Sequence, residues 1–230
     1  IKDRMDHSAA IFDSEGRLLA QAEHIPVHLG SLPWGLKNLI NISNKRTLPF
    51  KEGSMIVANN PYITGTHLND VTVIAPIYYK EELLGFTANK AHHSDIGGRV
   101  PGSISMDATT LYEEGFIIDP EYLMLKNEFV EEMLTCFSSH SRMPNERLGD
   151  IKAQAAANIT GIKRLTKIIS KYGPENFKES AVESFRYSES LTRQRISSLK
   201  KGIYSVEDWL EHPDGHDIKL KAKLTISDQE

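Results

Sequence analysis

The chain has 230 residues, of which 40% are hydrophobic and 25% charged, as in ordinary folded proteins with a substantial core. This composition excludes a disordered tail, a collagen-like repeat and a disulfide-stabilised miniprotein. The formal net charge of -4 argues against a nucleic-acid partner held mainly through phosphate contacts. Cys136 is the single cysteine, so an intramolecular disulfide is impossible, and we expect a reducing, cytoplasmic compartment. No apolar run approaches the roughly 18–20 residues that cross a bilayer, so we expect no membrane partner.

Strand signals separated by turn residues dominate the first 90 residues. They predict one hairpin from residues 9–12 and 17–22, and another from residues 71–79 and 83–90. Residues 54–58 are predicted to form a short buried strand between these hairpins.

One amphipathic helix is predicted between the first hairpin and the short strand. Ser31 is its expected cap, and Pro33 suits its first turn. Leu36, Leu39 and Ile40 then fall on one face.

After Met143 the pattern is helical. Apolar residues recur at gaps of three or four, which places one stripe along a single long helix: Leu148, Ile151, Ala155, Ile159, Ile162, Leu165, Ile169 and Tyr172. Gly173 and Pro174 end this helix, and a second amphipathic helix follows at once and ends near Gly202. Because the connection is so short, we predict an antiparallel helical hairpin that packs on the strand region or on another subunit.

The sequence therefore predicts an α+β fold with antiparallel or mixed strand hairpins and a long helical hairpin. We divide it into a metal-binding α+β region at 1–143, a helical hairpin at 144–202 and an incomplete β-containing region at 203–230. The last strand signal, at 218–226, stops almost as soon as it begins, and the chain lacks an initiator methionine. We therefore expect a piece of a longer protein.

Histidines near predicted strand ends carry the clearest chemical signal. His67 and Asp70 lie in a turn-rich loop just before one predicted strand, and His92 follows the strand that returns from it. Because the two strands form a hairpin, Asp70 and His92 should meet at the same end, with His67 beside them. Two imidazoles and a carboxylate are a common ligand set for zinc, manganese or iron(II). The alternative is that these histidines only hydrogen-bond to loop backbone.

Other chemistries have weaker support. The sequence has no phosphate-binding loop, no dinucleotide fingerprint, no His-Glu-x-x-His motif and no Gly-x-Ser-x-Gly elbow. Cys136 and His140 are four residues apart, but nothing around them is typical of a nucleophile pair.

Five ordered blocks resemble the N-terminal region of the hydantoinase B/oxoprolinase family. They are Asp6–Asp13, His24–Ser31, Gly65–Thr72, Ala91–Gly98 and Tyr112–Gly115, and residues 146–154 resemble the helix signature of that family. The resemblance implies a B-type subunit that holds a divalent metal and works in a hetero-oligomer with a hydantoinase A-like partner. ATP is then expected on the partner, which phosphorylates the substrate oxygen.

By motif position, the metal ligands of the family fall on His67, Asp70 and His92, with Asp6 as a possible further ligand. His93 and Asp95, next to His92, are candidates for proton transfer or for supporting hydrogen bonds.

Three further residues, Glu114, Asp150 and Asn60, bear on the site that this resemblance implies. Glu114 and Asp150 are lesser candidates, because an acid at a helix start more often serves the helix dipole or a salt bridge. Asn60 stands where the family commonly has aspartate, which would weaken metal binding if that carboxylate orients a ligating histidine.

Three functions remain open from the sequence. The first is the metal-bearing subunit of an ATP-dependent cyclic-amide hydrolase of the hydantoinase or 5-oxoprolinase type. The second is the corresponding subunit of an ATP-dependent ketone carboxylase of the acetone or acetophenone type. The third is a non-catalytic assembly module carried by the helical hairpin.

Overall fold

A computed structural model describes residues 5–45, 48–212 and 214–227. The chain forms two compact units, Ile1–Ala181 and Val182–Glu230. The mixed α and β content and the antiparallel sheet confirm the predicted fold class. No helix in the described part of the chain has both the length and the apolar character needed to cross a membrane.

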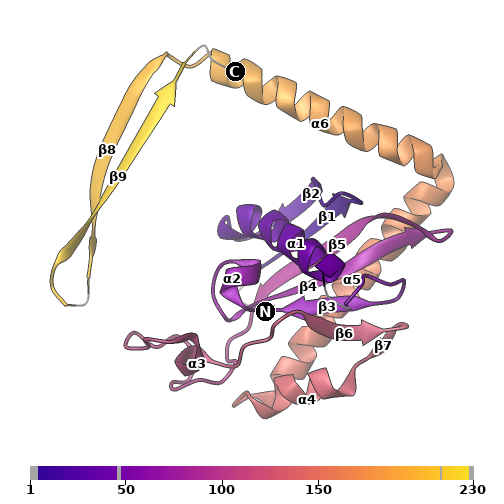
Figure 1. The fold of residues 1–230 in the computed structure, drawn as a ribbon, viewed down its shortest axis with the longest axis horizontal. Helices are drawn as coiled ribbons and strands as arrows, with labels where there is room; N and C mark the ends of the chain where they lie inside the picture. The colour runs from indigo at the N-terminus through magenta and orange to yellow at the C-terminus, as the bar shows by residue number, and fades with distance from the viewer. Residues whose placement is uncertain (1–4, 46–47, 213, 228–230) are drawn as a thin grey trace. The chain divides into compact units, whose positions relative to one another are not determined.

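The first unit is built on one antiparallel sheet of seven strands in the order β2-β1-β5-β4-β3-β6-β7 (Figure 1). The strands are β1 (His7–Asp13), β2 (Leu18–Glu23), β3 (Met55–Ala58), β4 (Asp70–Tyr79), β5 (Glu82–His92), β6 (Glu121–Leu125) and β7 (Glu128–Phe129). The predicted hairpins and the short buried strand are therefore present, whereas β6 and β7 were not predicted. Neither has the length that marks β4 and β5.

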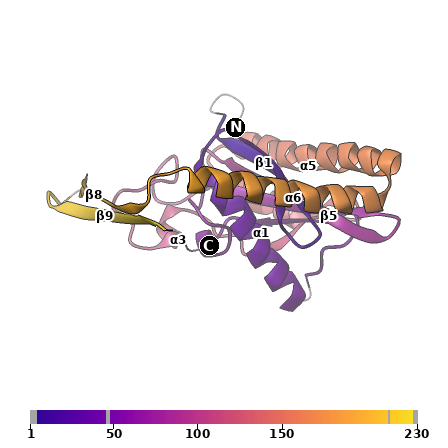
Figure 2. The same ribbon diagram turned by 90° about the horizontal axis from the view of Figure 1, so that it is seen from above.

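Helices cover both faces of this sheet, and Figure 2 shows α1 (Val27–Lys45) and α5 (Pro144–Tyr172) on opposite sides of the strands. On the α1 face, Leu32, Leu36 and Leu39 pack against buried strand residues that include Ile74 and Phe86. The remaining helices of this unit are α2 (Pro61–Thr64), α3 (Leu111–Glu114), α4 (Glu131–Ser139) and the start of α6 (Pro174–Ser197).

The other face of the sheet carries a second core. Ile151 and Ala155 of α5 pack there with Leu134 and Phe137 of α4 and with buried residues of β3 and β4. The two cores make the central strands buried on both faces. Burial of a polar residue in these strands is costly unless it is hydrogen-bonded, which is why the polar residues near the ends of β4 and β5 stand out.

The helix α1 begins four residues before the predicted cap at Ser31. His28, Leu32 and Leu36 are buried at gaps of four residues. The buried face of the helix therefore extends toward the N-terminus past Ser31, and the helix begins where this face begins. Pro33 consequently lies inside the helix and not in its first turn. The predicted cap was wrong because the packing of His28 was not visible in the local pattern.

The long helix α5 is confirmed, and Gly173, with a φ of 90°, ends it. The second helix, α6, is also present. Near its start, within the first unit, Ala181 is buried and Phe177 packs against a small apolar cluster that includes Ile169. Farther along the chain, Leu191 is 43% exposed, and Leu199, two residues beyond the end of α6, is 52% exposed. Packing of α6 along α5 beyond Ala181 therefore stays a prediction, as does the division into regions at 143 and 202.

The second unit ends in an antiparallel hairpin of β8 (Gly202–Glu211) and β9 (Asp217–Ile226). The predicted strand at 218–226 corresponds to β9, and its partner β8 was missed. In this hairpin Ile218, Leu220 and Leu224 lie on one face, while the lysines of β9 lie on the other. Both strands are exposed along almost their whole length.

Candidate metal centre

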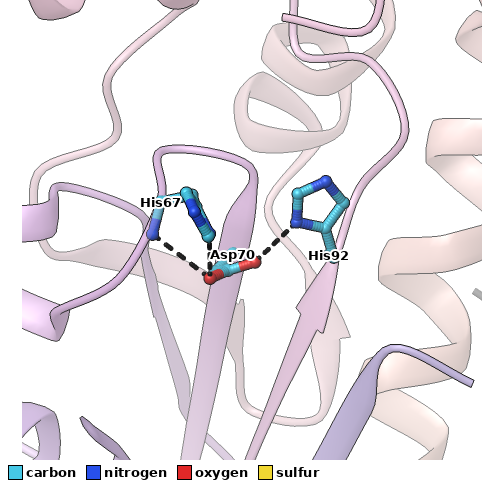
Figure 3. A group of neighbouring side chains, drawn as sticks. All are labelled: His67, Asp70 and His92. Atoms are coloured by element: carbon cyan, nitrogen blue, oxygen red, sulfur yellow. Dashed lines mark hydrogen bonds and ion pairs between the residues drawn. The ribbon is translucent and has the colours of Figure 1, made fainter. Parts of the chain in front are cut away.

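The ends of β4 and β5 bring the predicted metal ligands together. Asp70 is the first residue of β4 and His92 the last of β5, and the two are directly paired in the antiparallel register. Their side chains lie on the same face because directly opposite residues of paired strands point to the same side of the sheet. His67 belongs to the turn that enters β4, and Figure 3 shows both imidazoles directed at the Asp70 carboxylate from its two sides.

The geometry of this group fits a divalent metal. Nδ1 of His92 lies 2.8 Å from Asp70 Oδ1, and Nδ1 of His67 lies 3.2 Å from Asp70 Oδ2. One ligand atom from each of the three residues lies within 4.8 Å of the others. Two imidazoles and one carboxylate suit zinc, manganese or iron(II), and three protein ligands leave coordination positions open. The side chain of His67 is 65% exposed, whereas that of Asp70 is 2% exposed, so His67 is the solvent-exposed member of the group.

Asp70 is held as a carboxylate. Burial by itself raises its pKa, but hydrogen bonds from His92, from Thr66 and from the backbone N–H of His67 together lower its pKa below the ordinary value. A deprotonated carboxylate at this position is what binding of a divalent cation requires.

Two buried residues beside the group were not among the predicted site residues. His28 lies with Nε2 4.0 Å from Asp70 Oδ2 and Nδ1 3.0 Å from Ser8 Oγ, and burial lowers its pKa. Lys90, two residues before His92, is fully buried, and burial lowers its pKa to about 8 although the Asp70 carboxylate opposes this. The available signal for Lys90 was a lysine in a predicted strand, residues 83–90, that is otherwise uncharged. For His28, the packing of α1 was needed.

The structure does not bring every predicted residue into the group. The Asp6 carboxylate is not part of it, and the backbone carbonyl of Asp6 accepts a hydrogen bond from the His92 N–H at 3.0 Å. Its role as a ligand stays a prediction.

His93 lies on the opposite face of the sheet, fully buried, with Nε2 2.8 Å from Gln154 Oε1 on α5. Burial lowers its pKa to about 3, so the ring is neutral and shielded from solvent. This environment favours the supporting role over proton transfer.

Asp95 organises the loop after His92. Its carboxylate accepts hydrogen bonds from the backbone N–H of Gly97 at 2.9 Å and of Gly102 at 3.3 Å, and from Arg142 Nη1 at 2.9 Å. Burial alone raises the pKa of Asp95, but these bonds together lower it. All of these contacts are within the protein, so they favour a supporting role for Asp95 as well.

We expect Asp95→Asn to reduce the free energy of unfolding by about 1–3 kcal/mol, because the amide cannot accept all of these hydrogen bonds. The lowered pKa means that Asp95 stabilises the fold above the pKa of the unfolded chain, near 3.8, and that this contribution is lost as the pH falls through the folded pKa. The variant should therefore lose less stability on acidification below about pH 4 than the wild type. Urea unfolding at several pH values measures both effects, and Asp119→Asn on the surface is the control. Equal stability of Asp95→Asn and wild type would contradict this assignment.

The weaker candidates have structural partners. Asn60 caps α2 by accepting the Tyr62 N–H at 3.0 Å, and it donates to Asp119 at 2.9 Å. These contacts do not involve a histidine. Asp150 pairs with Arg147 at 2.8 Å, as expected for a salt bridge on a helix.

Cys136 and His140 also lack a reactive arrangement. Burial raises the pKa of the Cys136 thiol, and its sulfur lies 3.8 Å from His140 Nδ1. A thiol with a raised pKa is a poor nucleophile. A second group of potential ligands, His212, Asp214 and His216, lies in the β8–β9 turn and is largely exposed.

Comparison with known proteins gives a family. The model of the hydantoinase B/oxoprolinase family matches residues 1–230. An uncharacterised protein of Methanocaldococcus jannaschii is 44% identical over 226 residues, which is 98% of this chain and 40% of that protein. A 5-oxoprolinase of Dictyostelium discoideum is 37% identical over 98% of this chain and 18% of its own length. The caprolactamase subunit beta of Pseudomonas jessenii is 29% identical over 98% of this chain and 39% of its own length.

Two solved structures have the same fold. The ATP-dependent caprolactamase of Pseudomonas jessenii matches 96% of this chain with a TM-score of 0.86 and 27% identity, and the match covers 38% of that chain. An acetone carboxylase matches 97% of this chain and 31% of its own, with a TM-score of 0.78 and 20% identity. The chain thus spans about two fifths or less of the proteins it matches. It belongs to the hydantoinase B/oxoprolinase family.

Proposed function

We propose that this chain is the metal-binding part of an ATP-dependent cyclic-amide hydrolase that works with an ATP-binding partner subunit. The observation that carries the proposal is the convergence of His67, Asp70 and His92 at one accessible end of the sheet. Further support comes from relatives whose names are 5-oxoprolinase and caprolactamase subunit beta. The word subunit in such names supports a partner chain, and a hydantoinase A-like subunit is the partner that we propose.

The chemistry of amides explains why such a reaction divides between two sites. Resonance keeps an unstrained amide planar and makes its carbon a poor electrophile. Phosphorylation of the oxygen on the partner creates a good leaving group, and a divalent metal held by His67, Asp70 and His92 would supply activated water near neutral pH. Asp70 contributes the negative charge, while the exposed side of His67 leaves room for the substrate to approach.

Substrate-dependent ATP hydrolysis by the full-length protein together with its ATP-binding partner tests the proposal. The substrates are 5-oxoproline, hydantoin, caprolactam, and acetone with bicarbonate. We expect ATP hydrolysis coupled to ring opening of at least one cyclic amide. Carboxylation of acetone without hydrolysis of any cyclic amide would overturn the proposal in favour of a ketone carboxylase.

We expect the group of His67, Asp70 and His92 to hold about one divalent transition metal per chain, because its three ligands converge. Elemental analysis of the full-length protein, purified without chelators near neutral pH, gives the stoichiometry. Removal by a chelator should abolish turnover, and added Mn²⁺, Zn²⁺ or Fe²⁺ should restore it. Purified protein with no metal that also takes up none of these ions would contradict the site.

A further inference from the structure

Lys90 is a buried cation surrounded by neutral oxygens. Its Nζ donates to Thr64 O at 2.7 Å, Ser31 Oγ at 3.1 Å, Thr66 Oγ1 at 3.2 Å and Gly65 O at 3.3 Å. Across the residues that the structure describes, no ion pair of Lys90 with a carboxylate is found. Three of the four oxygens belong to residues 64–66, so the lysine side chain is directed at one particular turn.

This turn has an uncommon backbone conformation. Gly65 has a φ of 74° and Thr66 a φ of 72°, a region that β-branched residues such as threonine rarely adopt. Helix α1 packs closely against the turn, since a Cβ on Gly35 would lie 3.2 Å from both Cα and O of Thr64. Backbone conformations of this kind persist only where surrounding contacts hold them.

The same turn carries His67 into the metal group. The side chain of His67 is 65% exposed, so core packing cannot fix its orientation. Its N–H and its Nδ1 each lie 3.2 Å from Asp70 Oδ2, and these contacts require the preceding backbone to have its present path. The position of the His67 imidazole therefore depends on residues 64–66.

We propose that Lys90 is a positioning residue that holds the 64–66 turn so that His67 faces Asp70 and His92. The proposal rests on the metal site described under Proposed function. Lys90 acts through the backbone: its ammonium satisfies the buried carbonyl of Thr64, which an apolar side chain of the same length would leave without that donor, and it adds a second donor to the carbonyl of Gly65.

The test uses Lys90→Met in the full-length protein, with Mn²⁺ as the probe. We expect Mn²⁺ affinity by equilibrium dialysis to fall by about 10–100-fold, the range seen when residues that support metal ligands are removed. The EPR spectrum of bound Mn²⁺ should resemble that of His67→Ala. The double variant His67→Ala/Lys90→Met should bind Mn²⁺ no more weakly than His67→Ala, because both changes remove one interaction.

Asn158→Ala is the control for a purely structural effect. Asn158 lies on the α5 face, donates to Val73 O at 3.1 Å and accepts from Asn89, away from the turn. It should lower the unfolding temperature yet leave Mn²⁺ affinity within about twofold, since the metal group is not among its contacts. An unchanged Mn²⁺ affinity in Lys90→Met, or losses that multiply in the double variant, would overturn the positioning role.

Hydrogen exchange on metal-free protein separates this proposal from the metal site itself. Lys90→Met should speed exchange of residues 64–67 and leave the centre of β4 protected. If wild type binds no metal, the proposed function fails, while the exchange result still decides whether Lys90 holds the turn. Should Lys90→Met not fold, Ser31→Ala removes one of the oxygens around the ammonium and should change exchange and Mn²⁺ affinity in the same direction. No change in either measurement would overturn the proposal.

Discussion

His92→Ala is expected to abolish substrate-dependent turnover while the protein remains folded. His92 lies at the end of β5, and its backbone N–H bond to Asp6 O does not depend on the side chain. Loss of one of three protein ligands should remove most of the bound metal and reduce turnover to below about 1% of wild type. If His92 only hydrogen-bonds to Asp70, the variant should lose about 0.5–1.5 kcal/mol of stability and keep its activity.

Three measurements on the same samples distinguish these outcomes: turnover with partner and ATP, metal content, and thermal unfolding. His140→Ala is the matched control, because His140 is an exposed histidine outside the metal group. We expect it to behave as wild type. Retention of metal and of turnover within about tenfold of wild type would remove His92 from the ligand set, because a lost ligand should have a larger effect.

Asp70→Asn is expected to have an effect of similar size, mainly through the loss of charge. The substitution keeps the side-chain volume but removes the negative charge that a divalent cation needs at a site otherwise built from neutral imidazoles. The amide has only one accepting oxygen, so it cannot accept both the hydrogen bond from His92 and the one from the His67 N–H. We expect loss of at least about 100-fold in metal affinity, with a stability loss of about 1–3 kcal/mol.

Asp119→Asn makes the same chemical change on the surface, where Asp119 accepts a hydrogen bond from Asn60. It should alter neither metal content nor turnover. Mn²⁺ titrations of both variants and of wild type give the comparison. An Asp70→Asn protein with wild-type metal affinity would show that the carboxylate only orients the two histidines.

The sequence by itself determined those features that depend on local pattern. The strand signals along residues 71–79 and 83–90, separated by a three-residue turn, predict a hairpin, and a hairpin pairs its ends, so the approach of Asp70 and His92 followed from chain connectivity alone. The regular apolar spacing from Leu148 to Ile169 likewise predicted α5 to its last turn, because a helix of that length needs only one continuous stripe and a glycine stop.

Contacts between segments far apart in the chain were decided only by the tertiary structure. The start of α1 depends on His28 packing beside Asp70, and the role of Lys90 depends on α1 and the 64–66 turn closing over it. The two neighbours His92 and His93 lie on opposite faces of the sheet, one beside Asp70 and the other against Gln154 of α5. A local pattern reports which residues share a face, but the burial, partners and pKa of each group depend on which helix covers that face, and only the packed fold supplies that.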